Sequence, residues 1–297
     1  METIKKILEL EKIDYTKIEK SESGFTNLAY FIDNKYVIKV IAKQTKREKL
    51  QKEIEFYKNT NLDYIPKYIS SGCIDEIDYL IIEKLEGHSL FEIWHTLNDT
   101  QRDDIVVQIA KILKDFHKQN STFLDNKYIT LDWIEKWNKS FLLNIDILKQ
   151  KGYDTTLFED FRVNMLPKIF EQQKPALVYN DAHFDNFLYH NGKVKLIDFD
   201  RILYCSMDYE LLILKQMLDC PIKFASEKDE PNVDIKDYQN ILPILKAEYK
   251  QLFDFEYLEQ RVFIYQFIYN IGQSFEYHDT PRLENELNKF ISYFYKK

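Results

Sequence analysis

The chain has 297 residues, of which 45% are hydrophobic and 30% are charged, and its formal net charge is −8. A chain of this length buries roughly three quarters of its unfolded surface in one or two domains. The negative charge argues against a nucleic acid as the main partner, and no apolar run approaches the ~20 residues of a membrane span.

The first part of the chain predicts a small lobe of five strands and one helix. Asp33-Asn34-Lys35 is typical of a hairpin turn. Leu50, Ile54 and Tyr57 recur on one face of a helix predicted over 45–60. The expected strands are 18–23, 28–32, 36–41, 68–74 and 79–83.

From Ser89 onward the pattern is mainly helical. Two short strands interrupt it, at 187–189 and 194–197, and His190-Asn191-Gly192 is the turn expected between them. The predicted helices are 101–118, 131–149, 155–173, 209–218, 235–253, 257–271 and 282–295. We therefore expect an α+β chain with an N-terminal lobe over 1–86, a helical lobe over 87–297 and a hinge near 83–87.

Three polar residues of the large lobe have a spacing typical of phosphoryl transfer. Asn186 follows Asp181 by five positions, and Asp198 comes twelve further on. In sites of the protein-kinase type, the first Asp accepts the proton of the attacking hydroxyl, while the Asn and the second Asp hold metal ions. Mg²⁺ suits such oxygen ligands, since it binds through one or two carboxylates and substrate phosphates. We predict Asp181 as the catalytic base and Asn186 and Asp198 as Mg²⁺ ligands.

A rival interpretation uses the same loop. Asp181, His183 and Asp185 spell D-x-H-x-D, which a metal-dependent phosphohydrolase would use as a metal cluster. That interpretation leaves the N-terminal lobe without a role. We expect His183 to hold the loop through hydrogen bonds, and Asp200 to add charge or a hydrogen bond near the metal.

The small lobe carries a candidate phosphate lysine. Lys39 lies within an apolar strand, where a kinase places the lysine that holds the α- and β-phosphates and pairs with a Glu on the next helix. Glu53 is the best-placed partner, and Glu48 and Glu55 are alternatives. Outside a kinase, such a lysine would only extend its stem over apolar surface.

The loop at 21–27 is the expected phosphate loop. It has one glycine among small hydroxyl residues, whose backbone N–H groups would wrap phosphates, but it lacks a full G-x-G-x-x-G. The predicted nucleotide contacts from this loop are Ser23, Gly24 and Asn27.

Taken in order, these pieces resemble the aminoglycoside phosphotransferase and choline kinase superfamily, which are small-molecule kinases with a protein-kinase-like fold. The resemblance spans about 18–215. It is carried by Ser23-Gly24-Phe25-Thr26-Asn27, Lys39, Glu53, Ile65-Pro66-Lys67, the strand and hinge at 79–87, Asp181-x-His183-x-x-Asn186 and Ile197-Asp198-Phe199-Asp200.

The resemblance implies a bilobal fold with a nucleotide-binding N-lobe and a C-lobe that holds the catalytic loops and the acceptor site. It also implies that the hinge backbone, at Glu83 and Leu85, binds the base, with Ile82 gating the pocket. An aliphatic gate leaves room for adenine, so ATP with Mg²⁺ is the expected cofactor, and GTP stays open. Tyr179 departs from the family, which usually has His there, so a catalytically weak nucleotide-binding relative is a further alternative.

The acceptor is expected to be a small, cationic molecule with a hydroxyl group. An aminoglycoside, as in an antibiotic-resistance enzyme, is the first expectation, and choline or an amino-sugar is the alternative within the kinase class. Asp208 and Glu210, just after the strand that carries Asp198, are the candidates for binding it.

Three widely spaced cysteines, Cys73, Cys205 and Cys220, indicate reduced thiols rather than a disulfide framework. The charged N-terminus predicts no signal peptide. We therefore expect a cytoplasmic protein without membrane or nucleic-acid partners, and the sequence predicts no oligomeric state.

Overall fold

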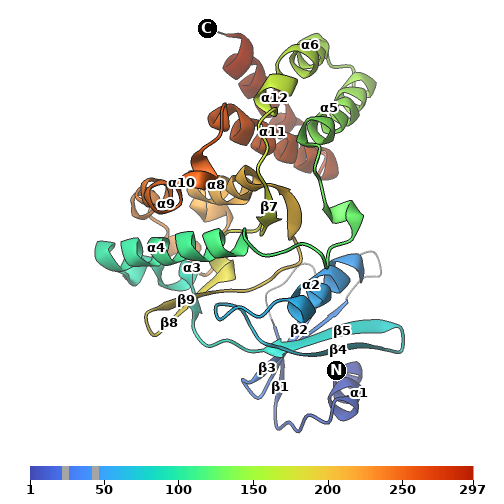
Figure 1. The fold of residues 1–297 in the computed structure, drawn as a ribbon, viewed down its shortest axis with the longest axis vertical. Helices are drawn as coiled ribbons and strands as arrows, with labels where there is room; N and C mark the ends of the chain where they lie inside the picture. Colours follow the sequence, from blue (N-terminus) through green and yellow to red (C-terminus); the bar gives the residue numbers. More distant parts are fainter. Residues whose placement is uncertain (22–26, 42–46, 297) are drawn as a thin grey trace.

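The computed structural model describes residues 1–21, 27–41 and 47–296. Figure 1 shows a small sheet with α2 (Arg47–Asn59) at one end, and a larger helical part that ends in α11 (Leu258–Glu276) and α12 (Thr280–Tyr295). The expected α+β arrangement, with strands first and helices after them, is therefore observed.

The small lobe contains one antiparallel sheet in the order β1-β2-β3-β5-β4. Asp33 and Asn34 both have positive φ, at 47° and 56°. Such a turn matches the right-handed twist of the two strands that it joins. The strands are β1 (Ile18–Lys20), β2 (Asn27–Ile32), β3 (Tyr36–Ile41), β4 (Tyr68–Ile74) and β5 (Ile77–Glu83).

Strand alternation decides where Lys39 points. Its neighbours Ile38 and Val40 belong to a buried cluster with Ile4 and Ile7 of α1 (Glu2–Leu10). Because successive side chains of a strand face opposite sides, Lys39 lies on the other face of the sheet. That is the face on which α2 packs.

The helix α1 was not predicted, because we expected a single helix in this lobe. Its apolar residues Ile4, Ile7 and Leu8 do have helical spacing, but the helix is only nine residues long. It forms because the sheet offers an apolar face to cover, and tertiary packing supplies most of the stability of so short a helix.

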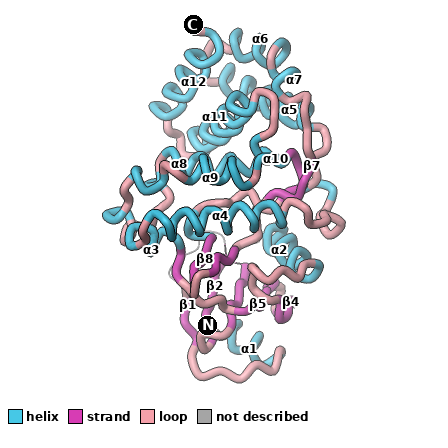
Figure 2. The backbone as a smooth tube through the Cα atoms, turned by 60° about the vertical axis from the view of Figure 1, so that its left-hand side comes forward, coloured by secondary structure: helices cyan, strands magenta, loops and turns pink. Residues whose placement is uncertain are grey.

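The large lobe is mainly helical, and Figure 2 shows α4, α8, α9 and α11 as successive layers above the sheet. Besides α11 and α12, its helices are α3 (Leu90–Ile93), α4 (Asp99–Phe116), α5 (Trp133–Gln150), α6 (Thr156–Asn164), α7 (Leu166–Ile169), α8 (Leu211–Asp219), α9 (Ile241–Glu248) and α10 (Lys250–Phe253). Its strands are β6 (His88–Ser89), β7 (Pro175–Val178), β8 (Phe187–His190), β9 (Lys193–Leu196) and β10 (Leu203–Ser206).

Two predicted helices are interrupted. The segment 155–173 divides at Met165 into α6 and α7, and Pro167 in the first turn of α7 lacks the N–H that a continuous helix needs. The segment 235–253 is a 3₁₀ turn followed by α9 and α10, which meet at Tyr249 with φ −133° and ψ 64°. The prediction of one continuous helix was wrong in both places.

Three short strands of the large lobe, β6, β7 and β10, were missed. β7 and β10 pair antiparallel, with Val178 opposite Leu203. Each has four residues, too few for alternation to be distinguished from helical spacing. Their pairing matters for the site, because β7 leads into the loop of Asp181 and β10 follows the loop of Asp198.

A hydrophobic core joins α2 to the large lobe. Phe199, next to Asp198, stacks on Phe56 of α2 with ring centroids 4.4 Å apart, and it also contacts Phe116 of α4. Fully burying one such ring contributes roughly 1.5–3 kcal/mol. The core therefore fixes the segment after β9 against both lobes.

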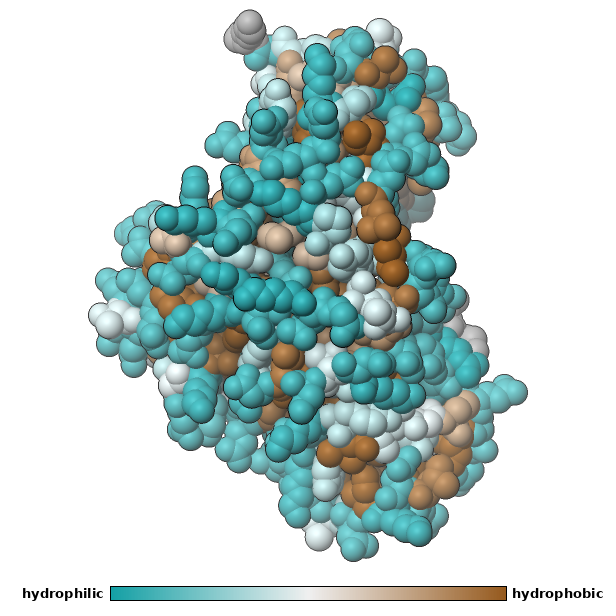
Figure 3. Space-filling view, in the orientation of Figure 1, coloured by the Kyte–Doolittle hydropathy of each residue, from teal (hydrophilic) through white to brown (hydrophobic). Residues whose placement is uncertain are grey.

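Figure 3 shows mainly hydrophilic side chains on the visible face, with apolar ones in separate patches.

Candidate active site

Lys39 lies at the centre of a charged cluster between the lobes. Its Nζ is 2.7 Å from Oε1 of Glu53 and 3.2 Å from Oδ1 of Asp198. Burial works against the charged amine, but Asp198 and Glu53 outweigh it and raise the pKa of Lys39 above its ordinary value. The lysine is therefore a fixed cation where strand β3, helix α2 and the loop after β9 meet.

Glu53 is completely buried and orients two groups. Its Oε1 accepts hydrogen bonds from Lys39 and, at 3.3 Å, from the backbone N–H of Phe199. Burial raises the pKa of Glu53, while the charge of Lys39 lowers it. The structure selects Glu53 over the two alternatives, because Glu48 pairs with Lys127 and Glu55 with Lys58.

Asp198 is held in a conformation that few residues adopt. Its φ is 63°, in the left-handed region, which costs on the order of 1–3 kcal/mol for a residue with a side chain. The side chain is 44% exposed. The packing of the buried Phe199 on Phe56 holds this strained backbone in place. The Asp198 carboxylate then reaches Lys39 of the small lobe.

The loop before β8 brings Asp181 and Asn186 together. The Nδ2 of Asn186 donates to Oδ2 and to the backbone oxygen of Asp181, both at 3.0 Å. This leaves Oδ1 of Asn186 without a donor among the described residues. A free amide oxygen and the exposed carboxylate of Asp198 form the donor set that Mg²⁺ takes when substrate phosphates and water complete its coordination.

His183 supports this loop. Its Nε2 lies 3.1 Å from Nδ2 of Asn186 and 3.6 Å from Oδ2 of Asp181. Burial would raise the pKa of Asp181, but the hydrogen bond from His183 and the charge of Arg201 lower it overall. Among the described residues, no group of three His, Cys, Asp or Glu side chains converges to hold a metal. The D-x-H-x-D cluster of the rival hydrolase is therefore not assembled.

Asp200 lies next to the cluster. Burial and the neighbouring charge of Asp198 raise its pKa. The Nζ of Lys49 on α2 is 3.9 Å from its Oδ2. Asp200 therefore lies close enough to Asp198 for their charges to interact.

Glu210 lies beneath the catalytic loop instead of facing an acceptor. Its carboxylate accepts the backbone N–H groups of Tyr179 at 2.8 Å and Asn180 at 3.1 Å, and it lies 3.1 Å from Nε2 of His117. The side chain is completely buried. Glu210 shapes the loop, because Asn180 is held at φ 59° directly before Asp181.

Asp208 is also completely buried and fully paired. It accepts two hydrogen bonds from Arg261 of α11, at 2.6 and 3.0 Å, and others from Ser206 and Tyr265. An acceptor reaches neither carboxylate in this arrangement. The prediction that Asp208 and Glu210 bind it was wrong, because both side chains turn into the core.

Tyr179, which departs from the family pattern, connects the two functional loops. Its hydroxyl donates to the backbone oxygen of Ile197 at 2.6 Å, and its ring packs edge-on against Phe199. The large ring is completely buried. Tyr179 therefore supplies a direct hydrogen bond between the segment that follows β7 and the segment that follows β9.

The predicted nucleotide contacts are only partly described. Ser23 and Gly24 lie outside the described residues, and so does the side chain of Asn27. Glu83 ends β5 and is half-buried, and Leu85 is buried just beyond it. In the described part of the chain, the Leu85 N–H donates no hydrogen bond to another backbone group.

Acidic side chains gather beside the catalytic loop. Burial raises the pKa of Asp185, and the charges of Asp229 and Glu92 add to this effect. The Oδ1 of Asp185 accepts a hydrogen bond from Ser89 at 3.2 Å. Glu92 lies on α3 and Asp229 in the segment after α8, so no local pattern predicts that their charges act on Asp185.

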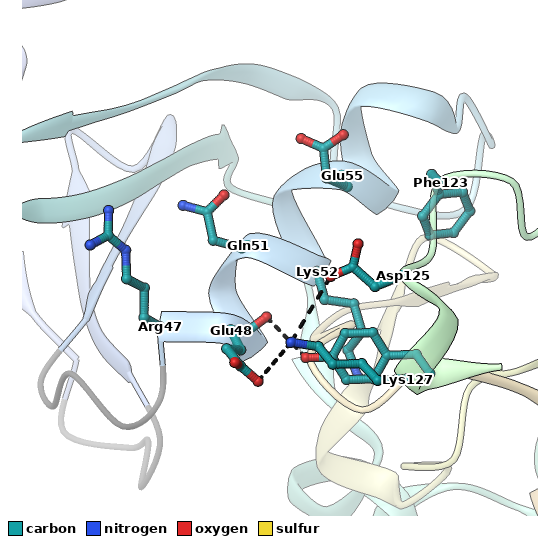
Figure 4. Close-up of a pocket in the computed structure, with 9 residues that line it drawn as sticks. Arg47, Glu48, Gln51, Lys52, Glu55, Phe123, Asp125 and Lys127 are labelled. Carbon is teal, nitrogen blue, oxygen red and sulfur yellow. Dashed lines mark hydrogen bonds and ion pairs between the residues drawn. The ribbon is translucent and has the colours of Figure 1, made fainter.

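A cavity of 270 Å³ lies on the outer side of α2, against the segment that follows α4. Figure 4 shows Lys127 directed toward Glu48 and Asp125, with which it forms ion pairs. None of the predicted catalytic, metal or nucleotide residues lines this cavity. Lys39, Glu53 and Asp198 meet elsewhere, where β3, α2 and the loop after β9 come together.

The structure also brings Arg201 into the site, which sequence reasoning missed. Its Nη1 lies 3.1 Å from Oδ1 of Asp181. Only its position directly after Asp200 pointed to the site.

Within the described residues, no helix combines the length and apolarity that crossing a membrane requires.

Comparison with known proteins places the chain among phosphotransferases. The model of the phosphotransferase enzyme family matches residues 17–226. The streptomycin–ATP ternary complex of APH(2")-IIa is 20% identical with a TM-score of 0.71, covering 98% of this chain and 95% of that one. ADP-bound aminoglycoside phosphotransferase APH(2'')-Ib is also 20% identical with a TM-score of 0.71, covering 97% and 95%.

A more distant similarity extends the same architecture. The macrolide 2'-phosphotransferase MphH from Brachybacterium faecium is 8% identical with a TM-score of 0.62, covering 96% of this chain and 97% of that one. At such identities the structures show a shared fold. The predicted bilobal, protein-kinase-like α+β fold is confirmed.

Proposed function

This chain belongs to the phosphotransferase enzyme family and is a small-molecule kinase, and we propose that it transfers the γ-phosphate of ATP to a hydroxyl of a small cationic acceptor. The observation that carries this proposal is that Lys39 and Glu53 meet Asp198, while the backbone bond from Ile197 to Asn186 places Asp198 beside the loop of Asp181 and Asn186. A hydrolase without a nucleotide would have no use for the buried Lys39–Glu53 pair.

Each residue has a role that follows from its chemistry. Phosphoryl transfer has a loose transition state, so the protein mainly positions the reactants and stabilises charge. Asp181 orients the acceptor hydroxyl and takes its proton. Its lowered pKa keeps it ionised near neutral pH, as a proton acceptor must be. His183 and Asn186 hold its carboxylate.

Nucleotide binding is assigned mainly to residues 1–86, and catalysis and acceptor binding to residues 87–297. Lys39 holds the α- and β-phosphates, while the backbone at Glu83 and Leu85 receives the base beside Ile82. ATP is the first choice because Ile82 is aliphatic. GTP is the alternative, and related folds have been solved with ATP, with ADP and with GDP.

Asp198 and Asn186 would hold Mg²⁺, and Asp200 would add negative charge next to it. The ion would neutralise negative charge that develops on the phosphate oxygens during transfer. Asp198, at 44% exposed, and the free Oδ1 of Asn186 fit this ion. Ser23, Gly24 and Asn27 complete the proposed phosphate contacts.

The acceptor is proposed to be cationic because of charge beside the catalytic loop. Burial is the main reason that the pKa of Asp185 is raised, and repulsion by the negative charges of Asp229 and Glu92 adds to it. An amino group would relieve this repulsion. An aminoglycoside is the first candidate, since related folds include complexes with gentamicin and streptomycin. Choline or an amino-sugar is the second.

The test measures transfer of labelled γ-phosphate from ATP and from GTP, with Mg²⁺, to a panel of aminoglycosides, choline and amino-sugars. Transfer to one class, lost in Asp181→Asn and kept in the exposed control Asp146→Asn, would support the proposal. Bound nucleotide without transfer to any acceptor would favour a catalytically weak relative. Phosphate release without an acceptor, undiminished in Lys39→Ala, would favour the hydrolase.

A further inference from the structure

Arg201 is a charged residue in contact with the proposed base, and the motif of Asp181, Asn186 and Asp198 gives it no role. Its guanidinium Nη1 donates to Oδ1 of Asp181 at 3.1 Å, while Oδ2 of Asp181 is taken by Asn186. The Arg201 side chain is 31% exposed. It therefore contacts the base and is still partly accessible to solvent.

The surroundings of Arg201 keep it charged and directed at the base. Burial opposes its charge, but Asp181, Tyr269, Asp200 and Tyr209 raise its pKa further. Only one of its five N–H groups is needed to hold Oδ1 of Asp181. Because its other N–H groups hydrogen-bond no described residue, they are available to a second anion.

Lys39 and Arg201 are two cations of the proposed site, and they have different partners. Lys39 lies with Glu53 and Asp198, at the end where the α- and β-phosphates are proposed to bind. Arg201 lies with Asp181, at the end where the acceptor hydroxyl is proposed to attack. In an in-line transfer the γ-phosphoryl group passes between these ends, so its oxygens come close to the cation beside the base.

We infer that Arg201 is a further catalytic residue, which hydrogen-bonds the γ-phosphate oxygens in the bound triphosphate and during transfer. In this step the acceptor oxygen forms a bond to phosphorus, and the bond from phosphorus to the β–γ bridging oxygen breaks. The hydroxyl proton goes to Asp181, and the nucleoside diphosphate leaves. Arg201 stays protonated and stabilises charge on the moving group. This inference rests on the proposed function.

The alternative is that Arg201 only anchors Asp181. The two roles differ in what they do to nucleotide binding. A residue that touches the γ-phosphate distinguishes a triphosphate from a diphosphate, whereas a tether of Asp181 does not. Lys39, which is proposed to hold the α- and β-phosphates, should affect both nucleotides.

The experiment measures binding of ADP and of a non-hydrolysable ATP analogue, both with Mg²⁺, by calorimetry. The proteins are the wild type, Arg201→Met, Arg201→Lys and Arg282→Met. Arg282, on α12, donates to Asn270 and serves as the matched control. ADP binding by each variant also reports that it has folded.

We expect Arg201→Met to weaken binding of the analogue about 10-fold, the loss of one charge-assisted hydrogen bond, and to leave ADP binding within about 2-fold. Turnover with the acceptor should fall by about 10²-fold, with the acceptor KM little changed. Arg201→Lys should recover part of both losses, since it keeps the charge but not the planar fork.

Equal affinities of wild type and Arg201→Met for the analogue would overturn the inference while the proposed function stands. So would a loss that is the same for ADP and the analogue. A wild type that binds neither nucleotide would overturn the proposed function, and this inference with it.

Discussion

The Nζ of Lys52 on α2 donates a hydrogen bond to the backbone oxygen of Ile202 at 2.8 Å. This bond joins the outer side of α2 to the chain that follows Asp200. Lys52 comes directly before Glu53, so the two side chains point about 100° apart on the helix. The helix that carries Glu53 is therefore tied to the segment after Asp198 at two points, because Glu53 also accepts the backbone N–H of Phe199.

Lys52 should make stability rise at high pH. Burial lowers its pKa to about 8, against an unfolded value near 10.5. Between these values the unfolded chain binds more protons, so the free energy of unfolding increases with pH, by on the order of 2 kcal/mol. Urea unfolding of wild type and Lys52→Met at pH 7.5, 9 and 10.5 measures the difference. The exposed Lys58→Met is the control, and a difference that does not change with pH would contradict the prediction.

Removing the ammonium group of Lys39 should impair nucleotide use. In Lys39→Met the buried Glu53 loses its partner, and we expect turnover to fall by at least ~10²-fold, with weaker binding of ATP and ADP alike. Steady-state kinetics and calorimetry measure both effects. Lys35→Met, in the exposed hairpin between β2 and β3, should behave as wild type. Normal turnover in Lys39→Met would remove Lys39 from the mechanism.

Replacing Asp181 should separate chemistry from binding. Asp181→Asn keeps the shape of the side chain but removes the proton acceptor, so kcat should fall by ~10² to 10⁴-fold. Nucleotide affinity should stay near that of the wild type, because Asp181 is placed at the acceptor end. Rapid-quench measurement of a single turnover isolates this step. An unchanged rate there would show that another group takes the proton.

Glu210 should act on the loop and not on the acceptor. In Glu210→Gln one amide NH₂ would face the backbone N–H groups of Tyr179 and Asn180, which leaves at least one buried donor unpaired. We expect the free energy of unfolding to fall by ~1–3 kcal/mol and kcat to fall, with the acceptor KM unchanged. Glu259→Gln, exposed on α11, is the control. A large rise in acceptor KM alone would restore the acceptor role that the burial of Glu210 argues against.

The hydroxyl of Tyr179 should contribute modestly. Tyr179→Phe keeps the buried ring and removes only the hydrogen bond to Ile197, so we expect a loss of ~1 kcal/mol in stability and less than a 10-fold fall in kcat. Thermal unfolding and steady-state kinetics measure the two. A loss of all activity would mean that this bond, and not packing, holds Asp198 in position.

Much of this site could be predicted from sequence because its residues lie close together in the chain or on regular elements. The spacing of Asp181, Asn186 and Asp198 is a property of one loop and one hairpin. The alternation of β3 decides that Lys39 faces away from the α1 side of the sheet, and the helical spacing of α2 presents Glu53. The strands of the small lobe and most helices followed from the same periodicities.

Other features depended on contacts between distant parts of the chain. Glu210 and Asp208 sit on a short 3₁₀ turn, which has no period long enough to show which side is buried. The breaks at Met165 and Tyr249 arise where packing and proline stop a helix that the apolar pattern would continue.

The sequence by itself determined the kind of chemistry, since the types and spacing of polar residues on local elements fix which groups can act together. Only the tertiary structure decided which groups meet them: Arg201 on Asp181, Glu210 beneath Asn180, and Asp229 and Glu92 beside Asp185. The physical reason is that these contacts join elements far apart in the chain. Their positions follow from how the apolar faces of those elements pack, and local periodicity does not predict that packing.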